Sequence, residues 1–178
     1  MDKKRVLGVL GGKAMAPSKI AAWLAEADFV IGADSGLLRV LEAGFVPDAV
    51  IGDFDSVPVE VADASTTTIV DRSQDITDCA KLLNYVASLG YKKVTLLCAE
   101  GSLSDHVLNT IHSAVQSSLN VRLALDRGVA FILKDGDEMT VQTEVDARVS
   151  LIPLEHVSAA WLSGVHWPLN GDSISPRG

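Results

Sequence analysis

The stretch DFVIGADSGLLRVLEAGFVPDAVIGDFD, residues 28–55, contains two short apolar runs with a helical pattern between them. The runs at residues 28–33 and 49–52 are rich in β-branched and small side chains, which predicts buried strands. Residues 37–43 have the apolar spacing of a short helix, and Gly44 stands where glycine commonly ends helices. Because a strand, a crossover helix and a second strand normally form a parallel pair, this stretch predicts a parallel sheet.

The same alternation extends along the chain from residue 5 to residue 125. Further strands are expected at residues 5–10, 66–70, 93–98 and 121–125, and further helices at residues 17–27, 75–89 and 104–119. Such alternation is typical of an α/β fold with a doubly wound, mostly parallel sheet and helices on both faces.

The pattern changes near residue 126. Short alternating runs follow without a helical period, and turn sequences such as Lys134-Asp135-Gly136-Asp137 separate them; these runs predict strands at residues 129–133, 138–143, 148–151 and 159–162. We therefore expect an α/β domain at residues 1–126 and a small antiparallel, sandwich-like β domain at residues 127–178.

Composition and charge exclude several classes of protein. The chain has 178 residues, of which 48% are hydrophobic and 21% charged, so it can bury a core. Its net charge of −8 argues against a nucleic-acid partner, although a nucleotide remains possible if a cation bridges its phosphates. Without a signal peptide or an apolar run of about 18 residues, we expect a soluble cytoplasmic protein that does not enter membranes.

Acidic side chains follow several of the predicted strands. Asp34 follows the strand at residues 28–33, and Asp53 and Asp55 follow the strand at residues 49–52; Asp71, Asp75, Asp78 and Asp105 follow the next two strands. Because the carboxyl ends of parallel strands meet at the ligand-binding edge of such a sheet, these acids should collect there. Like charges so close together are unfavourable unless some of the acids are protonated or a cation neutralises them, and ligation by oxygen alone suits Mg²⁺.

Single features of this set also have structural explanations. An isolated Asp-x-Asp is commonly a solvated turn, and acids in the first turn of a helix, such as Asp75 and Asp78, often only cap it. Lys13 follows two glycines and could approach a phosphate, but the segment lacks the spacing of a P-loop. A plain strand-to-helix turn is an equal alternative for Lys13.

Several segments together resemble the thiamine pyrophosphokinase family, and they occur in the family's order. The family carries Ala-Asp-Gly-Gly, Pro-Asp, Gly-Asp-Phe-Asp-Ser and Gln-Asp-x-Thr-Asp. This chain has Ala33-Asp34-Ser35-Gly36, Pro47-Asp48, Gly52-Asp53-Phe54-Asp55-Ser56 and Gln74-Asp75-Ile76-Thr77-Asp78. Residues 101–106, including Ser102, match a further family segment loosely, and residues 150–154 and 164–169 look like its thiamine-binding β domain.

The chain also departs from the family pattern. Ser35 replaces a Gly, and Leu103 replaces an Arg that is expected to contact phosphate. The family continues beyond the point where this chain ends, into a Ser-Asn segment that helps to hold thiamine. This predicts either a truncated β domain or a substrate site completed in another way.

The resemblance implies a Mg²⁺-dependent transfer of the diphosphoryl group of ATP to the hydroxyl of thiamine, which yields thiamine diphosphate and AMP. It implies Asp53, Asp55 and Asp78 as metal ligands, and Asp34 and Asp105 as orienting acids; one of these acids accepts the hydroxyl proton. It further implies nucleotide contacts from the set Lys13, Arg39, Gln74, Asp75 and Thr77. Thiamine would contact Trp167 and Asp105, although a place for Trp167 in the core of the β domain is an equal alternative. The protein would be a homodimer whose thiamine site combines the α/β domain of one subunit with the β domain of the other.

Three other interpretations remain open at this point. A degenerate family member would bind thiamine or nucleotide without turnover. A signalling receiver domain also places acids at strand ends, but it does not explain the C-terminal β segment. A nucleotide-sugar transferase would use Asp53-Phe54-Asp55 as its metal motif.

Overall fold

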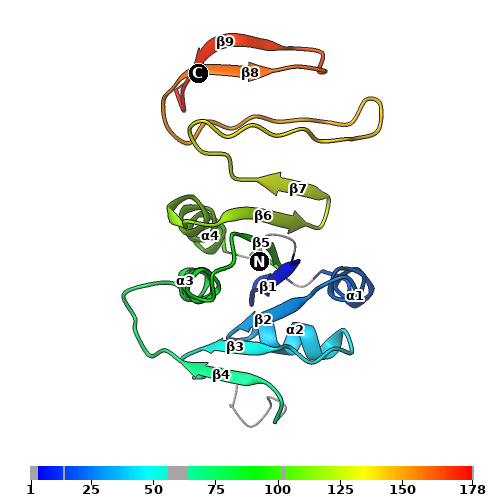
Figure 1. Cartoon of the computed structure of the whole chain (residues 1–178), viewed down its shortest axis with the longest axis vertical. Coiled ribbons are helices and arrows are strands. Elements are labelled where there is room, and N and C mark those ends of the chain that lie inside the picture. The colour runs from blue at the N-terminus through cyan, green and yellow to red at the C-terminus, as the bar shows by residue number, and fades with distance from the viewer. Residues whose placement is uncertain (1–3, 14, 56–63, 102, 178) are drawn as a thin grey trace. The chain divides into compact units, whose positions relative to one another are not determined.

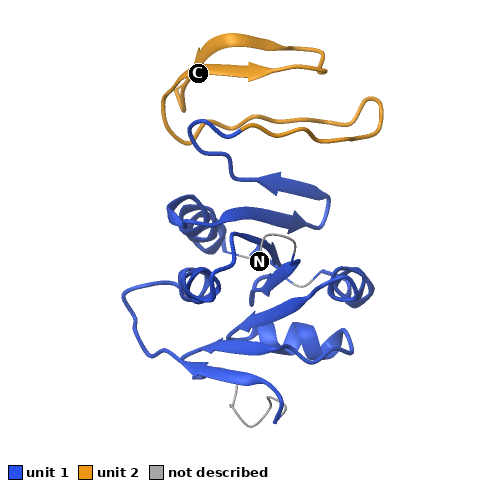
Figure 2. Cartoon of the chain, in the orientation of Figure 1, with its two compact units in different colours: residues 1–137 blue, residues 138–178 orange. Residues whose placement is uncertain are grey.

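The computed structural model describes residues 4–13, 15–55, 64–101 and 103–177. Ser56 and Ser102, which belong to the segments quoted above, lie outside the described residues. The chain divides into two compact units, unit 1 with residues 1–137 and unit 2 with residues 138–178 (Figure 2).

Unit 1 is built on a seven-stranded sheet with the order β4-β3-β2-β1-β5-β6-β7 (Figure 1). The strands are β1 (Val6–Val9), β2 (Phe29–Ala33), β3 (Ala49–Gly52), β4 (Thr67–Val70), β5 (Lys93–Leu97), β6 (Asn120–Leu125) and β7 (Gly128–Phe131). Strands β1 to β6 pair in parallel, whereas β7 is antiparallel to β6. This confirms the doubly wound, mostly parallel fold that the alternation predicts.

Helices cover both faces of this sheet (Figure 1). They are α1 (Pro17–Leu24), α2 (Gly36–Glu42), α3 (Asp78–Ser88) and α4 (Ser104–Gln116). Leu82 of α3 belongs to a buried cluster with Val6 of β1, while Ile20 of α1 belongs to a second cluster with Leu7 of β1. Neighbouring residues of a strand point to opposite faces, so one strand supplies both cores.

Helix α3 begins three residues later than the sequence predicts. Thr77 is its N-cap, and the Thr77 hydroxyl oxygen accepts a hydrogen bond of 3.1 Å from the backbone N–H of Ala80. A cap of this kind ends the preceding loop, so Asp75 lies in that loop with Gln74 and not in the helix as expected.

The boundary expected at residue 126 differs from the division in the structure, which falls after Asp137. Strand β7, which the sequence assigned to the second domain, pairs with β6 over the register Arg122↔Phe131 to Leu125↔Gly128. The two residues Asp126 and Arg127 form a tight hairpin turn, which allows β7 to return along the edge of the same sheet.

Unit 2 has one two-stranded antiparallel sheet, formed by β8 (Val157–Leu162) and β9 (Leu169–Ile174). The strands expected at residues 138–143 and 148–151 do not form, and a sandwich of two facing sheets is not present among the described residues. Strand β9 contains the sequence Asn170-Gly171-Asp172, which hides it from pattern analysis. Alternation creates a strand only where a partner strand supplies hydrogen bonds, and the sequence pattern does not specify that partner.

No helix in the described part of the chain has the length and apolar character needed to cross a bilayer.

Candidate metal and nucleotide site

The sheet of unit 1 reverses its strand order between β1 and β5. From β1 the chain adds β2, β3 and β4 on one side, and it then crosses over through α3 to add β5 and β6 on the other. In sheets of this type, ligands bind outside the carboxyl ends of the strands at the point of reversal. The loops that follow β1, β2, β3 and β5 therefore form the candidate site.

Three residues on these loops have left-handed backbone conformations. Asp34 follows β2 with φ of 46°, Phe54 follows β3 with φ of 59°, and Cys98 follows β5 with φ of 54°. This conformation costs a residue other than glycine roughly 1–2 kcal/mol, and such strained residues cluster at functional sites. Its occurrence on three loops at one edge supports a functional role for that edge.

A cluster of three carboxylates lies at this edge. Asp34, Asp53 and Asp55 each offer one oxygen, and these oxygens lie within 4.8 Å of one another. The Oδ1 atom of Asp34 is buried and has no hydrogen-bond partner in the described part of the chain. Burial, with smaller contributions from the charges of Asp78, Asp53 and Asp55, raises the pKa of Asp34, although the backbone N–H of Ser35 opposes this shift. The cluster therefore has the donor atoms and the unmet charge that a hard cation would satisfy.

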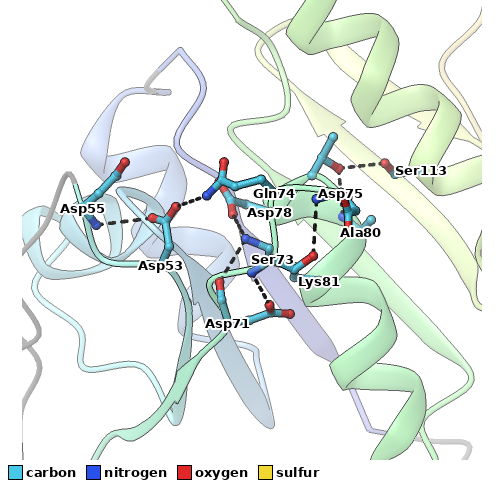
Figure 3. A network of polar contacts seen from close by, with 11 residues as sticks. Asp53, Asp55, Asp71, Ser73, Gln74, Asp75, Asp78, Ala80, Lys81 and Ser113 are labelled. Atoms are coloured by element: carbon cyan, nitrogen blue, oxygen red, sulfur yellow. Dashed lines mark hydrogen bonds and ion pairs between the residues drawn. The ribbon is translucent and has the colours of Figure 1, made fainter.

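The pKa of Asp53 is shifted in the opposite direction from that of Asp34, although both residues belong to the same cluster. Its Oδ1 accepts a hydrogen bond of 3.3 Å from the backbone N–H of Asp55, and its Oδ2 accepts one of 3.0 Å from the side-chain amide of Gln74 (Figure 3). These two hydrogen bonds, and then the positive charge of Lys81, lower the pKa of Asp53. Asp53 is thus held as a carboxylate in a fixed orientation.

The loop between β4 and α3 holds Gln74, Asp75 and Thr77 of the Gln-Asp-x-Thr-Asp motif, and Asp78 is the first residue of α3. Gln74 donates a hydrogen bond to Asp53 of the carboxylate cluster (Figure 3). Thr77 caps α3 and shares a hydrogen bond of 3.1 Å with the hydroxyl of Ser113 on α4. The Oδ1 atom of Asp78 accepts a hydrogen bond of 3.2 Å from Lys81. Asp75 is exposed, and its backbone N–H donates to the Ser73 hydroxyl.

The other predicted site residues of unit 1 lie outside the three-carboxylate cluster. Asp105 is exposed in the first turn of α4. Lys13 follows β1, where its backbone N–H donates to the carbonyl of Glu100; its charge contributes, after that of Lys19, to a lowered pKa of Asp126.

Arg39 of α2 forms an ion pair of 3.2 Å with Glu42, and its buried Nε has no partner among the described residues.

Trp167 belongs to unit 2. Its side chain is 81% exposed, and its ring meets the ring of His166 edge-on with centroids 4.6 Å apart. An exposed aromatic face of this kind is available to a ligand.

Sequence analysis missed Lys81, a residue of α3 that is only 3% exposed. The available signal was a lysine three residues after Asp78 and directly before the apolar pair Leu82-Leu83. Lysines are almost never fully buried without a partner, so a lysine on the apolar face of a helix indicates a nearby acid.

These features define a class of protein, namely a doubly wound α/β protein with a carboxylate site at the carboxyl edge of its sheet. The family model "Thiamin pyrophosphokinase, catalytic domain" matches residues 20–125 of the chain. A curated thiamine pyrophosphokinase of Bacillus subtilis (strain 168) is 25% identical over 177 residues, which cover 94% of this chain and 82% of the relative.

Solved structures show the same fold. The crystal structure of thiamine pyrophosphokinase from Bacillus subtilis has a TM-score of 0.69 and 22% identity, with coverage of 96% of this chain and 85% of the other. A thiamin pyrophosphokinase family protein from Enterococcus faecalis has a TM-score of 0.69 and 23% identity, with coverage of 96% and 84%.

The chain belongs to the thiamine pyrophosphokinase family, which is a family of enzymes. The resemblance found in the sequence is thereby confirmed, and the receiver-domain and sugar-transferase interpretations are set aside.

Proposed function

We propose that this protein transfers the diphosphoryl group of ATP to the hydroxyl of thiamine. The observation that carries the proposal is the Asp34–Asp53–Asp55 cluster, with its unpartnered buried oxygen, in a chain of this family. In the reaction, a bond forms between the thiamine hydroxyl oxygen and the β-phosphorus of ATP. The bond from the β-phosphorus to the oxygen that bridges to the α-phosphorus breaks, AMP leaves, and a carboxylate of the site takes the hydroxyl proton.

The residues of the cluster fit Mg²⁺. All three candidate ligands are carboxylate oxygens, which hard cations prefer, and the Asp34 oxygen lacks any other partner among the described residues. When bound, Mg²⁺ would neutralise negative charge on the phosphates, which is the main requirement of phosphoryl transfer. Asp78 remains a predicted ligand from the family resemblance, but the contact found for its carboxylate is with Lys81.

The protein's own groups would bind and orient the substrates. Gln74 fixes the carboxylate of Asp53 through its amide nitrogen, which leaves the amide oxygen available for the nucleotide. Roles for Asp75, Thr77, Lys13 and Arg39 toward the nucleotide, and for Asp105 as a base or orienting acid, stay predictions.

Thiamine carries a positively charged thiazolium ring. An aromatic face attracts such a cation with about 0.5–2 kcal/mol, and the exposed ring of Trp167 is our candidate. The homodimer and the cytoplasmic location expected from the sequence also stay predictions; sedimentation of the purified protein tests the dimer.

The test is product analysis by chromatography. Purified protein with thiamine, ATP and MgCl₂ should release AMP and thiamine diphosphate in equal amounts, and chelation of the metal with EDTA should stop the reaction. Release of ADP, or of AMP without thiamine diphosphate, would contradict the proposal. Calorimetric binding of thiamine and nucleotide without any AMP would support the degenerate, non-catalytic alternative, for which Leu103 in place of the family's Arg is the specific observation.

A further inference from the structure

Lys81 is a buried cation beside a group of acids. Its side chain is 3% exposed, and the next two residues of α3, Leu82 and Leu83, are buried in the core. Removal of an ammonium group from water costs several kcal/mol unless partners compensate. This buried lysine contacts the loop between β4 and α3, whose residue Gln74 donates to Asp53 of the carboxylate cluster.

The ammonium group of Lys81 joins the two ends of that loop. It donates a hydrogen bond of 3.1 Å to the backbone carbonyl of Asp71, directly after β4, and one of 3.2 Å to Oδ1 of Asp78, in the first turn of α3 (Figure 3). Gln74 lies between these two anchor points and donates to Asp53. Lys81 thus connects the two ends of the loop between β4 and α3, and Gln74 of that loop contacts the carboxylate cluster.

Lys81 also affects the charge of the site. Asp78, Asp53 and Asp55 are the charges that act on Asp34, and all three are negative. The positive charge found to act on Asp53 is that of Lys81. One buried cation therefore offsets part of the acidic charge of the cluster before any ligand arrives.

We propose that Lys81 is a positioning residue whose buried ammonium ties Asp78 to the Asp71 carbonyl and makes the site favour a metal–nucleotide complex over a bare divalent ion. This inference rests on the proposed function, because it takes the ligand to be a nucleoside triphosphate with its cation. Such a complex carries a net negative charge, so additional negative charge in the site repels it. The same additional charge attracts a bare divalent cation.

Replacement of Lys81 by methionine removes the charge and keeps much of the side-chain volume. In K81M the site becomes one unit more negative, so Mn²⁺ alone should bind about five- to tenfold more tightly. The complex of Mg²⁺ with a non-hydrolysable ATP analogue should bind more weakly by a similar factor. A role in folding alone would weaken both ligands together or change neither.

The experiment measures Mn²⁺ by electron paramagnetic resonance and the nucleotide complex by calorimetry, for wild type, K81M and the exposed-lysine control K92M. K92M should match wild type in both. If K81M does not fold, K81Q, which also removes the charge, carries the same expectation.

Shifts of both ligands in the same direction in K81M, or no shift of either, would overturn the inference. So would a wild-type protein that binds neither probe. These binding readouts do not depend on turnover. Opposite shifts in a protein that makes no thiamine diphosphate would uphold the role of Lys81 and contradict the proposed reaction alone.

Discussion

The two units of the molecule differ in where their apolar side chains lie. The buried hydrophobic residues of the structure all lie between Val6 and Ala124, within unit 1. No described residue of unit 2 is buried, and Ile152, Trp161 and Trp167 are 73%, 73% and 81% exposed. Unit 1 therefore stabilises its own fold, whereas a two-stranded sheet without a core is marginal by itself. Side chains that must be held at fixed distances from one another, such as the carboxylate cluster, therefore lie in the unit that has a buried core. Unit 2 can offer exposed side chains.

The largest expected effect is on the chemistry of unit 1. Asp55→Asn should lower Mg²⁺-dependent AMP release by roughly 100- to 1,000-fold, because it removes one carboxylate from the cluster. The melting temperature should change little, since Asp55 is exposed. Asp135→Asn, an exposed acid outside the site, is the matched control and should keep full activity. Turnover like that of wild type in D55N would exclude Asp55 from the metal site.

A pair of core and surface substitutions tests the comparison directly. Leu82→Ala in unit 1 should lower the free energy of unfolding by about 2–5 kcal/mol, because Leu82 is fully buried. Ile152→Ala in unit 2 should change it by less than about 0.5 kcal/mol. Denaturant titration measures both. A loss above about 1 kcal/mol for I152A would show that unit 2 buries this side chain in solution, and the comparison would fail.

Replacement of Trp167 should have a smaller effect, which is confined to thiamine. Trp167→Ala should raise the KM for thiamine by roughly 2- to 30-fold, the equivalent of one cation–π contact, and leave the KM for ATP unchanged. Trp161→Ala is the control, because Trp161 is almost as exposed but lies on β8. Equal effects of the two variants would indicate a general disturbance of unit 2 and would remove Trp167 from the substrate site.

The smallest expected effect concerns stability without metal. Burial and neighbouring acids raise the pKa of Asp34, so the folded state loses stability as pH rises from the ordinary Asp range through that raised pKa. Asp34→Asn removes this penalty, and Asn tolerates the left-handed backbone at φ of 46°. At neutral pH without Mg²⁺, D34N should melt at a higher temperature than wild type.

Two further measurements test whether the Asp34 carboxylate causes this difference in melting temperature. The difference in melting temperature should disappear in acid, below the ordinary pKa of Asp, where wild-type Asp34 is protonated. Mg²⁺ should stabilise wild type but not D34N. A lower melting temperature for D34N at neutral pH would show that the Asp34 carboxylate is stabilising without metal, contrary to the expectation.

Much of unit 1 was predictable because its signals are local. The run at residues 28–33, the helical spacing of residues 37–43 and Gly44 with φ of 82° depend on backbone preference and burial over a few neighbours. The β strands of unit 2 were less predictable, since residues 138–143 alternate without a partner and β9 pairs despite its Asn170-Gly171-Asp172 sequence.

By itself, the sequence determined the alternation of strands and helices and the placement of acids at strand ends, and its motifs identified the family. Only the tertiary structure decided that Asp34 joins Asp53 and Asp55 within one cluster, that Lys81 takes Asp78 as its partner, and that β7 extends the main sheet. Periodicity is set by near neighbours along the chain, whereas these contacts depend on strand order and on which buried charges must be compensated. Those conditions are met only when distant segments pack together.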